Sequence, residues 1–168
     1  MKLILIGFMG SGKTTISQLY GSLFQQPVFD LDAEVVQAAN ASIPEIFAQH
    51  GEHYFRDLEH QVLAKTIRRD GILATGGGTP IRDDNAQLLI DNAAPVVWLQ
   101  PDTPTTLQRI REQAGDRPIG DRLNEHGVDN LQQQRHAAYA RCADMTIDTD
   151  GLTPQQIVEQ IHRSLAVK

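Results

Sequence analysis

The sequence has few of the residues that mark several classes of protein. It contains one cysteine, Cys142, in 168 residues, which excludes an intrachain disulfide and a cysteine-rich zinc site. No apolar run approaches the roughly 20 residues that span a bilayer, and the apolar run at 3–6 is too short for the core of a signal peptide. We therefore expect a cytoplasmic protein that does not enter a membrane.

Basic residues are also scarce. Lysine and arginine number 15 against 21 acidic residues, and the net charge of -6 argues against general binding to nucleic acid or to anionic membranes. Only four of the 15 are lysines, and arginine is suited to fixed, bidentate recognition of oxyanions. The length and the average composition predict a single domain over residues 1–168, which we expect to be a monomer.

Short apolar runs alternate with longer amphipathic segments along the whole chain. This alternation is typical of crossover units in a parallel α/β sheet. The expected strands are 3–6, 27–29, 72–75, 96–99 and 145–147. The expected helices are 13–24, 33–39, 44–49, 53–69, 84–92, 103–113, 130–142 and a closing helix that begins near Thr153.

One segment, residues 113–128, departs from this alternation. It contains three glycines, charges of both signs and few apolar residues. Loops of this length without their own secondary structure are usually functional, and we expect a mobile lid here.

A phosphate-binding motif stands between the first expected strand and the first expected helix. Residues 7–14 read GFMGSGKT, which matches GxxxxGK(S/T) in the context that this motif requires. Its backbone N–H groups converge on phosphate oxygens, Lys13 reaches the β and γ phosphates, and the hydroxyl of Thr14 suits Mg²⁺. The motif predicts a nucleotide site, and other motifs must say what is done with the nucleotide.

Two large classes of phosphate-loop protein lack support in this sequence. No lysine follows an asparagine, so the NKxD motif of small GTPases is absent, and there is no LSGGQ motif of the ABC type. Kinases of small metabolites remain.

Two aspartates, Asp30 and Asp32, follow the expected strand 27–29. The carboxyl edge of a parallel sheet is where ligands bind in α/β proteins, so one carboxylate could hold Mg²⁺ through water and the other accept a hydrogen bond from the attacking hydroxyl. The alternative is that Asp32 only caps the helix that begins near Ala33.

Two further features suggest a substrate site. Arg56 and Glu59 lie three residues apart on one helical face, either as a weak surface ion pair or with Glu59 fixing the guanidinium for a substrate carboxylate. The glycines 76–78 follow the strand 72–75, and three adjacent glycines exceed what an ordinary turn needs. They bring bare backbone close to a ligand.

Together these motifs resemble the shikimate kinase family of the P-loop nucleoside-monophosphate-kinase-like group. The resemblance covers nearly the whole chain. It rests on GFMGSGKT at 7–14, DLD at 30–32, EIFAQHGEHYFRDLE at 45–59, ATGGGTP at 74–80, DRP at 116–118, and Arg135 with Tyr139 and Ala143 at intervals of four.

The resemblance implies a three-layer α/β/α fold with a central five-stranded parallel sheet of the P-loop kinase type and a mobile lid. It implies transfer of the γ-phosphate of ATP to the 3-hydroxyl of shikimate, with Mg²⁺ as metal, in the biosynthesis of chorismate and the aromatic amino acids. The substrate-binding segment is then about 31–60 and the lid about 113–128.

Residue roles also follow from the resemblance. It assigns Lys13, Asp32 and Arg117 to catalysis, with Asp32 as base or orienter, and Thr14 and Asp30 to the metal. It assigns the substrate to Asp32, Arg56, the glycines Gly76, Gly77 and Gly78, and Arg135, with Glu59 in support. ATP binding is assigned to Gly10, Ser11, Gly12, Lys13, Thr14, Thr15 and Arg117. A further arginine near the lid is either Arg109 or Arg111.

Two other functions are compatible with the phosphate loop. One is a small kinase for gluconate or a nucleoside monophosphate, although a pair of anion-binding arginines suits a carboxylated ring better. The other is a nucleotide-binding regulator without catalysis, which the presence of Lys13, Asp32 and Arg117 disfavours.

Overall fold

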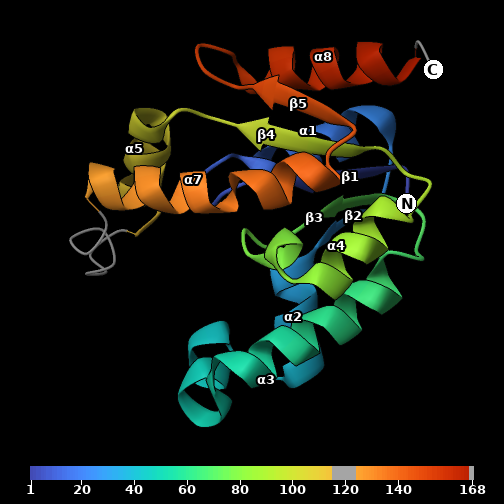
Figure 1. Ribbon diagram of the computed structural model, residues 1–168. Coiled ribbons are helices and arrows are strands. Elements are labelled where there is room, and N and C mark those ends of the chain that lie inside the picture. The colour runs from blue at the N-terminus through green and yellow to red at the C-terminus, as the bar shows by residue number, and fades with distance from the viewer. Residues whose placement is uncertain (115–123, 167–168) are drawn as a thin grey trace.

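Five parallel strands form a single sheet at the centre of the computed structural model, which describes residues 1–114 and 124–166 (Figure 1). The strand order is β2-β3-β1-β4-β5, and every neighbouring pair is parallel. The five predicted strands are thereby confirmed, with ends that differ by one residue at most. The strands are β1 (Leu3–Ile6), β2 (Val28–Asp30), β3 (Ile72–Ala74), β4 (Val96–Gln100) and β5 (Met145–Asp148).

Helices lie on both faces of the sheet, as the predicted three layers require (Figure 1). Helices α1 and α8 cover one face, α3, α4 and α7 cover the other, and α2 packs chiefly against α3. The helices are α1 (Lys13–Phe24), α2 (Leu31–Ala39), α3 (Ile43–Thr66), α4 (Asp83–Ile90), α5 (Thr103–Ala114), α7 (Glu125–Cys142) and α8 (Pro154–Ala166), with a short 3₁₀ turn η1 (Thr79–Ile81) before α4.

The core divides according to the alternation of side chains along β1. Leu3 and Leu5 pack with α1 and α8, whereas Ile4 and Ile6 belong to the larger cluster formed with α2, α3, α4 and α7. Because all four side chains are buried, β1 is covered on both faces, which explains why its sequence is an unbroken apolar run. Among the described residues no helix is both long and apolar enough to cross a bilayer.

Helix α3 joins two segments that the sequence predicts as separate helices. Gly51 lies between them with φ 81° and ψ 176°, a conformation that a side chain rarely adopts, so the helix bends there. Ser42 caps the first segment in a capping box with Glu45. The separation predicted between helices 44–49 and 53–69 is thus present as a bend at Gly51, and Arg56 and Glu59 lie in the second segment.

Both ends of the predicted lid, 113–128, are helical. Helix α5 extends to Ala114, and α7 begins at Glu125, five residues before the predicted start at Asn130. Asn124 caps α7 by accepting a hydrogen bond from the Gly127 N–H, and Val128 is fully buried. Residues 115–123, which include Arg117, lie outside the described part of the chain.

Candidate active site

The phosphate loop connects β1 to α1 and is built on glycines that no other residue could replace. Gly10 and Gly12 have φ angles of 75° and 91°. A Cβ at Gly7 would lie 2.6 Å from the Leu99 carbonyl oxygen and 2.7 Å from Ser11 Oγ. The chain therefore turns tightly at the carboxyl end of β1 and leads directly into the N-terminus of α1, where partial positive charge favours an anion.

Lys13 occupies the position that the motif predicts and folds back over its own loop. Its Nζ donates hydrogen bonds to the carbonyl oxygens of Gly7 (2.8 Å) and Phe8 (2.9 Å) and to Ser11 Oγ (3.3 Å). Burial lowers the pKa of Lys13 to about 8, against the opposing attraction of Asp32 and Asp30. The lysine is thus a buried cation held close to where phosphates would lie.

Asp30 ends β2 and begins α2. Its Oδ1 accepts hydrogen bonds from the backbone N–H groups of Asp32 (3.0 Å) and Ala33 (3.3 Å), so Asp30 is the N-cap of α2. Its Oδ2 accepts a hydrogen bond from Thr14 Oγ1 at 3.0 Å. The alternative in which Asp32 caps the helix is therefore wrong, because β2 extends one residue further than predicted and α2 starts at Leu31.

Asp32 lies in the first turn of α2 and faces the tri-glycine segment. A Cβ at Gly76 would come within 2.8 Å of Asp32 Oδ1. The pKa of Asp32 is raised, mainly by burial and then by the neighbouring carboxylates Asp30 and Glu59, against the attraction of Lys13 and Arg56. A carboxylate with a raised pKa is a better proton acceptor than one on the surface.

Arg56 is held by a buried carboxylate. Its Nη1 donates to Glu59 Oε2 at 3.1 Å, and Glu59 is only 1% exposed. The other oxygen, Glu59 Oε1, accepts a hydrogen bond of 2.8 Å from Thr79 Oγ1. Of the two interpretations of the Arg56–Glu59 spacing, the structure supports the one in which Glu59 fixes the guanidinium, and it adds Thr79, to which the sequence analysis gives no role.

Arg135 and Tyr139 meet on one backbone atom. Arg135 Nη1 donates to the Gly77 carbonyl oxygen at 3.5 Å, and the Tyr139 hydroxyl donates to the same oxygen at 2.5 Å. Arg135 also lies over the ring of Phe8 at 5.2 Å. Burial raises the pKa of Tyr139 to about 12, so its hydroxyl remains a donor at physiological pH. Tyr139 belongs to one of the sequence motifs, but no function is predicted for it from the sequence.

The three glycines of 76–78 border different parts of the site. Added Cβ atoms would lie 2.8 Å from Asp32 Oδ1 at Gly76, 3.1 Å from Met9 N at Gly77, and 2.8 Å from Arg56 Nη1 at Gly78. The segment therefore runs in close contact with the phosphate loop, with Asp32 of α2 and with Arg56 of α3. Side chains from α2, α3 and α7 meet around this segment beside the phosphate loop, as the sequence predicts.

Arg109 and Arg111 lie in different surroundings on α5. Arg109 Nη1 donates to the Gly10 carbonyl oxygen at 3.4 Å, whereas Arg111 is exposed beside Glu125 in a shallow surface hollow. Arg109 is the arginine that adjoins the phosphate loop. Arg117, predicted to close over the phosphates, falls outside the described residues.

The family model and the curated relatives give the same family. The family model described as shikimate kinase matches residues 9–166. The shikimate kinase of Limosilactobacillus fermentum is 51% identical, covering 96% of this chain and 93% of that protein, and the one of Enterococcus faecalis is 35% identical, covering 97% of each.

Solved structures agree with these relatives. Shikimate kinase from Acinetobacter baumannii, in complex with shikimate, superposes with a TM-score of 0.88 at 28% identity, covering 98% of this chain and 92% of that one. The shikimate kinase structure from Aquifex aeolicus has a TM-score of 0.80 at 30% identity, covering 99% and 97%.

Proposed function

Since the chain belongs to the shikimate kinase family and transfers the γ-phosphate of ATP to the 3-hydroxyl of shikimate, we propose that it divides this work between two adjoining groups of residues. The phosphate loop binds ATP, and the residues around Gly76, Gly77 and Gly78 bind shikimate. The observation that carries this proposal is the tri-glycine segment, which contacts the phosphate loop at Met9 and approaches Arg56 at Gly78.

Arg56 and Arg135 bind the carboxylate of shikimate. Each guanidinium is oriented by other groups, Arg56 by Glu59 and Arg135 by the Gly77 carbonyl and the Phe8 ring. Because these contacts use only some of the five N–H donors of each guanidinium, donors remain for a substrate oxyanion. Arginines fixed in advance lose little freedom when the substrate binds.

Asp32 accepts the hydrogen bond of the attacking hydroxyl, as base or orienter. Its place between the tri-glycine segment and the phosphate loop supports this role, as does its raised pKa. Phosphoryl transfer depends more on in-line positioning and charge neutralisation than on proton removal, so orientation of the hydroxyl is the larger contribution.

Lys13 neutralises charge on the β and γ phosphates. The phosphate oxygens replace the carbonyl oxygens of Gly7 and Phe8 that Nζ now contacts. Arg109 assists from α5, and we assign Arg117 to the same task on the basis of the DRP motif. The backbone of Gly10 to Thr15 supplies the N–H donors for the phosphates.

Thr14 and Asp30 are the residues that would hold Mg²⁺. The described residues contain no cluster of three or more carboxylate, histidine or cysteine ligands. This suits Mg²⁺, which commonly takes only one or two protein groups and completes its shell with phosphates and water. Thr14 Oγ1 and Asp30 Oδ2 lie 3.0 Å apart and offer the oxygen donors that this metal prefers. The ion would supply positive charge at the phosphates.

We also propose that the enzyme acts as a monomer in the cytoplasm, without nucleic acid or membrane partners. The net charge of -6 and the single cysteine, a buried free thiol at Cys142, support this. Light scattering of the purified protein tests the monomer directly.

The decisive experiment measures ADP release with shikimate, with gluconate, with nucleoside monophosphates and with no acceptor. We expect stimulation by shikimate alone. Arg56→Ala should raise the KM for shikimate about 10- to 100-fold, the loss of a charge-assisted hydrogen bond, with little change in the KM for ATP. Equal effects on the two KM values would contradict the assignment of Arg56 to shikimate.

A further inference from the structure

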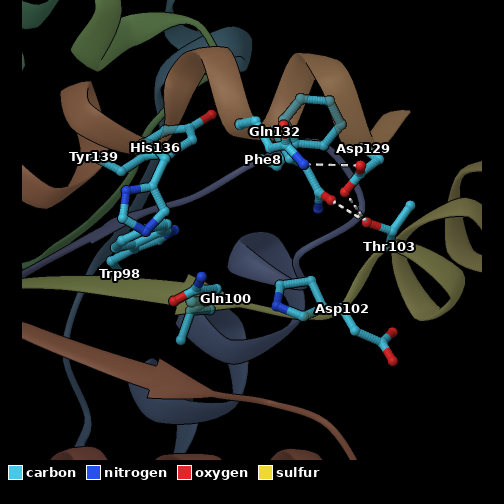
Figure 2. Close-up of a pocket in the computed structure, with 12 residues that line it drawn as sticks. Phe8, Trp98, Gln100, Asp102, Thr103, Asp129, Gln132, His136 and Tyr139 are labelled. Carbon is cyan, nitrogen blue, oxygen red and sulfur yellow. Dashed lines mark hydrogen bonds between the residues drawn. The ribbon is translucent and has the colours of Figure 1, made fainter. Parts of the chain in front are cut away.

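A second cavity lies outside the active site. It has a volume of about 280 Å³ and is enclosed by the end of β4, the start of α5 and one face of α7 (Figure 2). Of its lining residues only Phe8 belongs to the phosphate loop, and neither Lys13, Asp32, Arg56 nor Arg135 lines it. The roles proposed above leave this cavity without a function.

The walls of the cavity are largely aromatic. Trp98, the only tryptophan of the chain, forms one wall, and the ring of His136 meets it edge-on at 5.0 Å and 76° (Figure 2). Tyr139 lies 5.4 Å from Trp98, and Phe8 completes the aromatic lining. Of these rings only His136 is exposed, whereas Trp98, Phe8 and Tyr139 are each at most 6% exposed, so a planar ligand ring would contact mainly His136 and the accessible part of Trp98.

The charge of the lining has one sign. Asp102 and Asp129 contribute carboxylates, and none of the described residues that line the cavity is a lysine or arginine. Asp129 accepts hydrogen bonds only from neutral groups, Thr103 Oγ1 at 3.3 Å and Gln133 Nε2 at 2.9 Å, and it forms no ion pair with any described residue. Such a lining attracts a cation and repels anions, which include both ATP and shikimate.

We propose that this cavity binds a small aromatic compound that carries a primary ammonium group. The ring packs against the exposed ring of His136 and the accessible part of Trp98, which are themselves in contact, and the ammonium group binds Asp129 in addition to its present neutral partners. The volume is at the lower end for small-molecule sites and fits one substituted ring. The site is separate from phosphoryl transfer, and nothing in that reaction requires it.

The occupant would contact the residues that support the shikimate site. Phe8 carries the contact with Arg135, and Tyr139 holds the Gly77 carbonyl, so both side chains reach from this cavity to the substrate residues. The single hydroxyl proton of Thr103 is shared between Gln132 Oε1 at 2.8 Å and Asp129 Oδ1 at 3.3 Å, which joins α5 to α7 across the cavity (Figure 2). An occupant of this cavity would therefore contact side chains that support the active site without overlapping the substrates.

Trp98 provides a direct measurement of binding, because it is the only tryptophan and lines the cavity. Its fluorescence is titrated with phenethylamine, phenethyl alcohol and hydrocinnamate, which share a phenyl ring and differ in charge. We expect a saturable change with phenethylamine, about threefold weaker affinity for the alcohol, which corresponds to the loss of one partly exposed ion pair, and no response to hydrocinnamate at the same concentrations.

Two variants identify the carboxylate. Asp129→Asn should weaken phenethylamine about threefold and leave the alcohol unchanged, since the amide oxygen still accepts from Thr103. Asp70→Asn is the matched control, because Asp70 lies in an exposed surface pair with Lys2. An equal loss in both variants, or equal binding of hydrocinnamate, would overturn the proposed charge selection.

Competition distinguishes this cavity from the active site. Saturating ATP and shikimate, added separately, should leave the dissociation constant of phenethylamine within about twofold. Displacement by either substrate would place the probe in the active site and overturn the proposal. Because this titration measures binding and not turnover, a negative result would contradict the cavity proposal and would say nothing against the kinase activity.

Discussion

The hydroxyl of Tyr139 provides the sharpest test of how the substrate site is held together. Tyr139→Phe removes one oxygen atom and keeps the ring in its contact with Trp98. The Gly77 carbonyl then retains only the long contact with Arg135 at 3.5 Å. Tyr139 is 1% exposed, so water does not readily replace the lost donor.

The size of the effect follows from the hydrogen bond itself. A buried hydrogen bond contributes about 1 kcal/mol net, and an unsatisfied carbonyl adds to the loss, so the free energy of unfolding should fall by about 1–2 kcal/mol. The bond can favour the binding-competent position of Gly77 and Arg135 by no more than its own contribution. About 1 kcal/mol corresponds to a rise of roughly fivefold in the KM for shikimate.

The assay compares urea unfolding with steady-state kinetics for both substrates. The KM for ATP should stay within about twofold, since the hydrogen bond that is lost goes to Gly77, which we assign to the shikimate side of the site. Tyr20→Phe is the control, because its hydroxyl pairs with His162 at 3.4 Å on the opposite face of the sheet. If Tyr139→Phe loses stability with an unchanged KM for shikimate, the tyrosine is structural only and the reasoning is refuted.

Three further predictions concern the charged groups of the site. Because burial lowers the pKa of Lys13 to about 8, the free enzyme loses this positive charge above pH 8, and kcat/KM for ATP should fall about tenfold per pH unit there; a flat profile to pH 10 would contradict the role of Lys13. Gly78→Ala places a Cβ 2.8 Å from Arg56 Nη1, so the guanidinium must move, and the KM for shikimate should rise about tenfold in steady-state assays while the melting temperature changes little. Glu59→Gln should raise the KM for shikimate and lower the melting temperature, whereas Glu52→Gln should leave both nearly unchanged. Equal effects of the two variants in kinetics and thermal melts would show that burial of the carboxylate that pairs with Arg56 does not matter.

The sequence predicts the parts of this molecule whose signal is local. The strand at 3–6 is an apolar run buried on both faces, and the phosphate loop is a contiguous motif, so both are found where expected. The start of α7 is not predicted, because Gly127 and the polar residues around it hide a helical turn whose one apolar side chain, Val128, is buried by tertiary contacts.

Contacts between distant segments carry no local signal. Tyr139 and Gly77 are 62 residues apart, and Thr79 reaches Glu59 across 20 residues. The roles of Asp30 and Asp32 depend on whether β2 ends at residue 29 or 30, which is within the error of any strand boundary read from one sequence. The choice between Arg109 and Arg111 likewise depends on which side of α5 faces Gly10.

An acidic protein that binds two anions must keep its cations from being neutralised by its own carboxylates, and the two partners of Arg56 show how this is done. Glu52 is 69% exposed, so its pair with Arg56 contributes little and would readily be replaced by the shikimate carboxylate that we assign to Arg56. Glu59 is buried and also bonded to Thr79, so it stays in place and orients the guanidinium. The net charge of -6 therefore lies mostly where water screens it, whereas Lys13, Arg56 and Arg135 present their charge at the site, where screening is weaker.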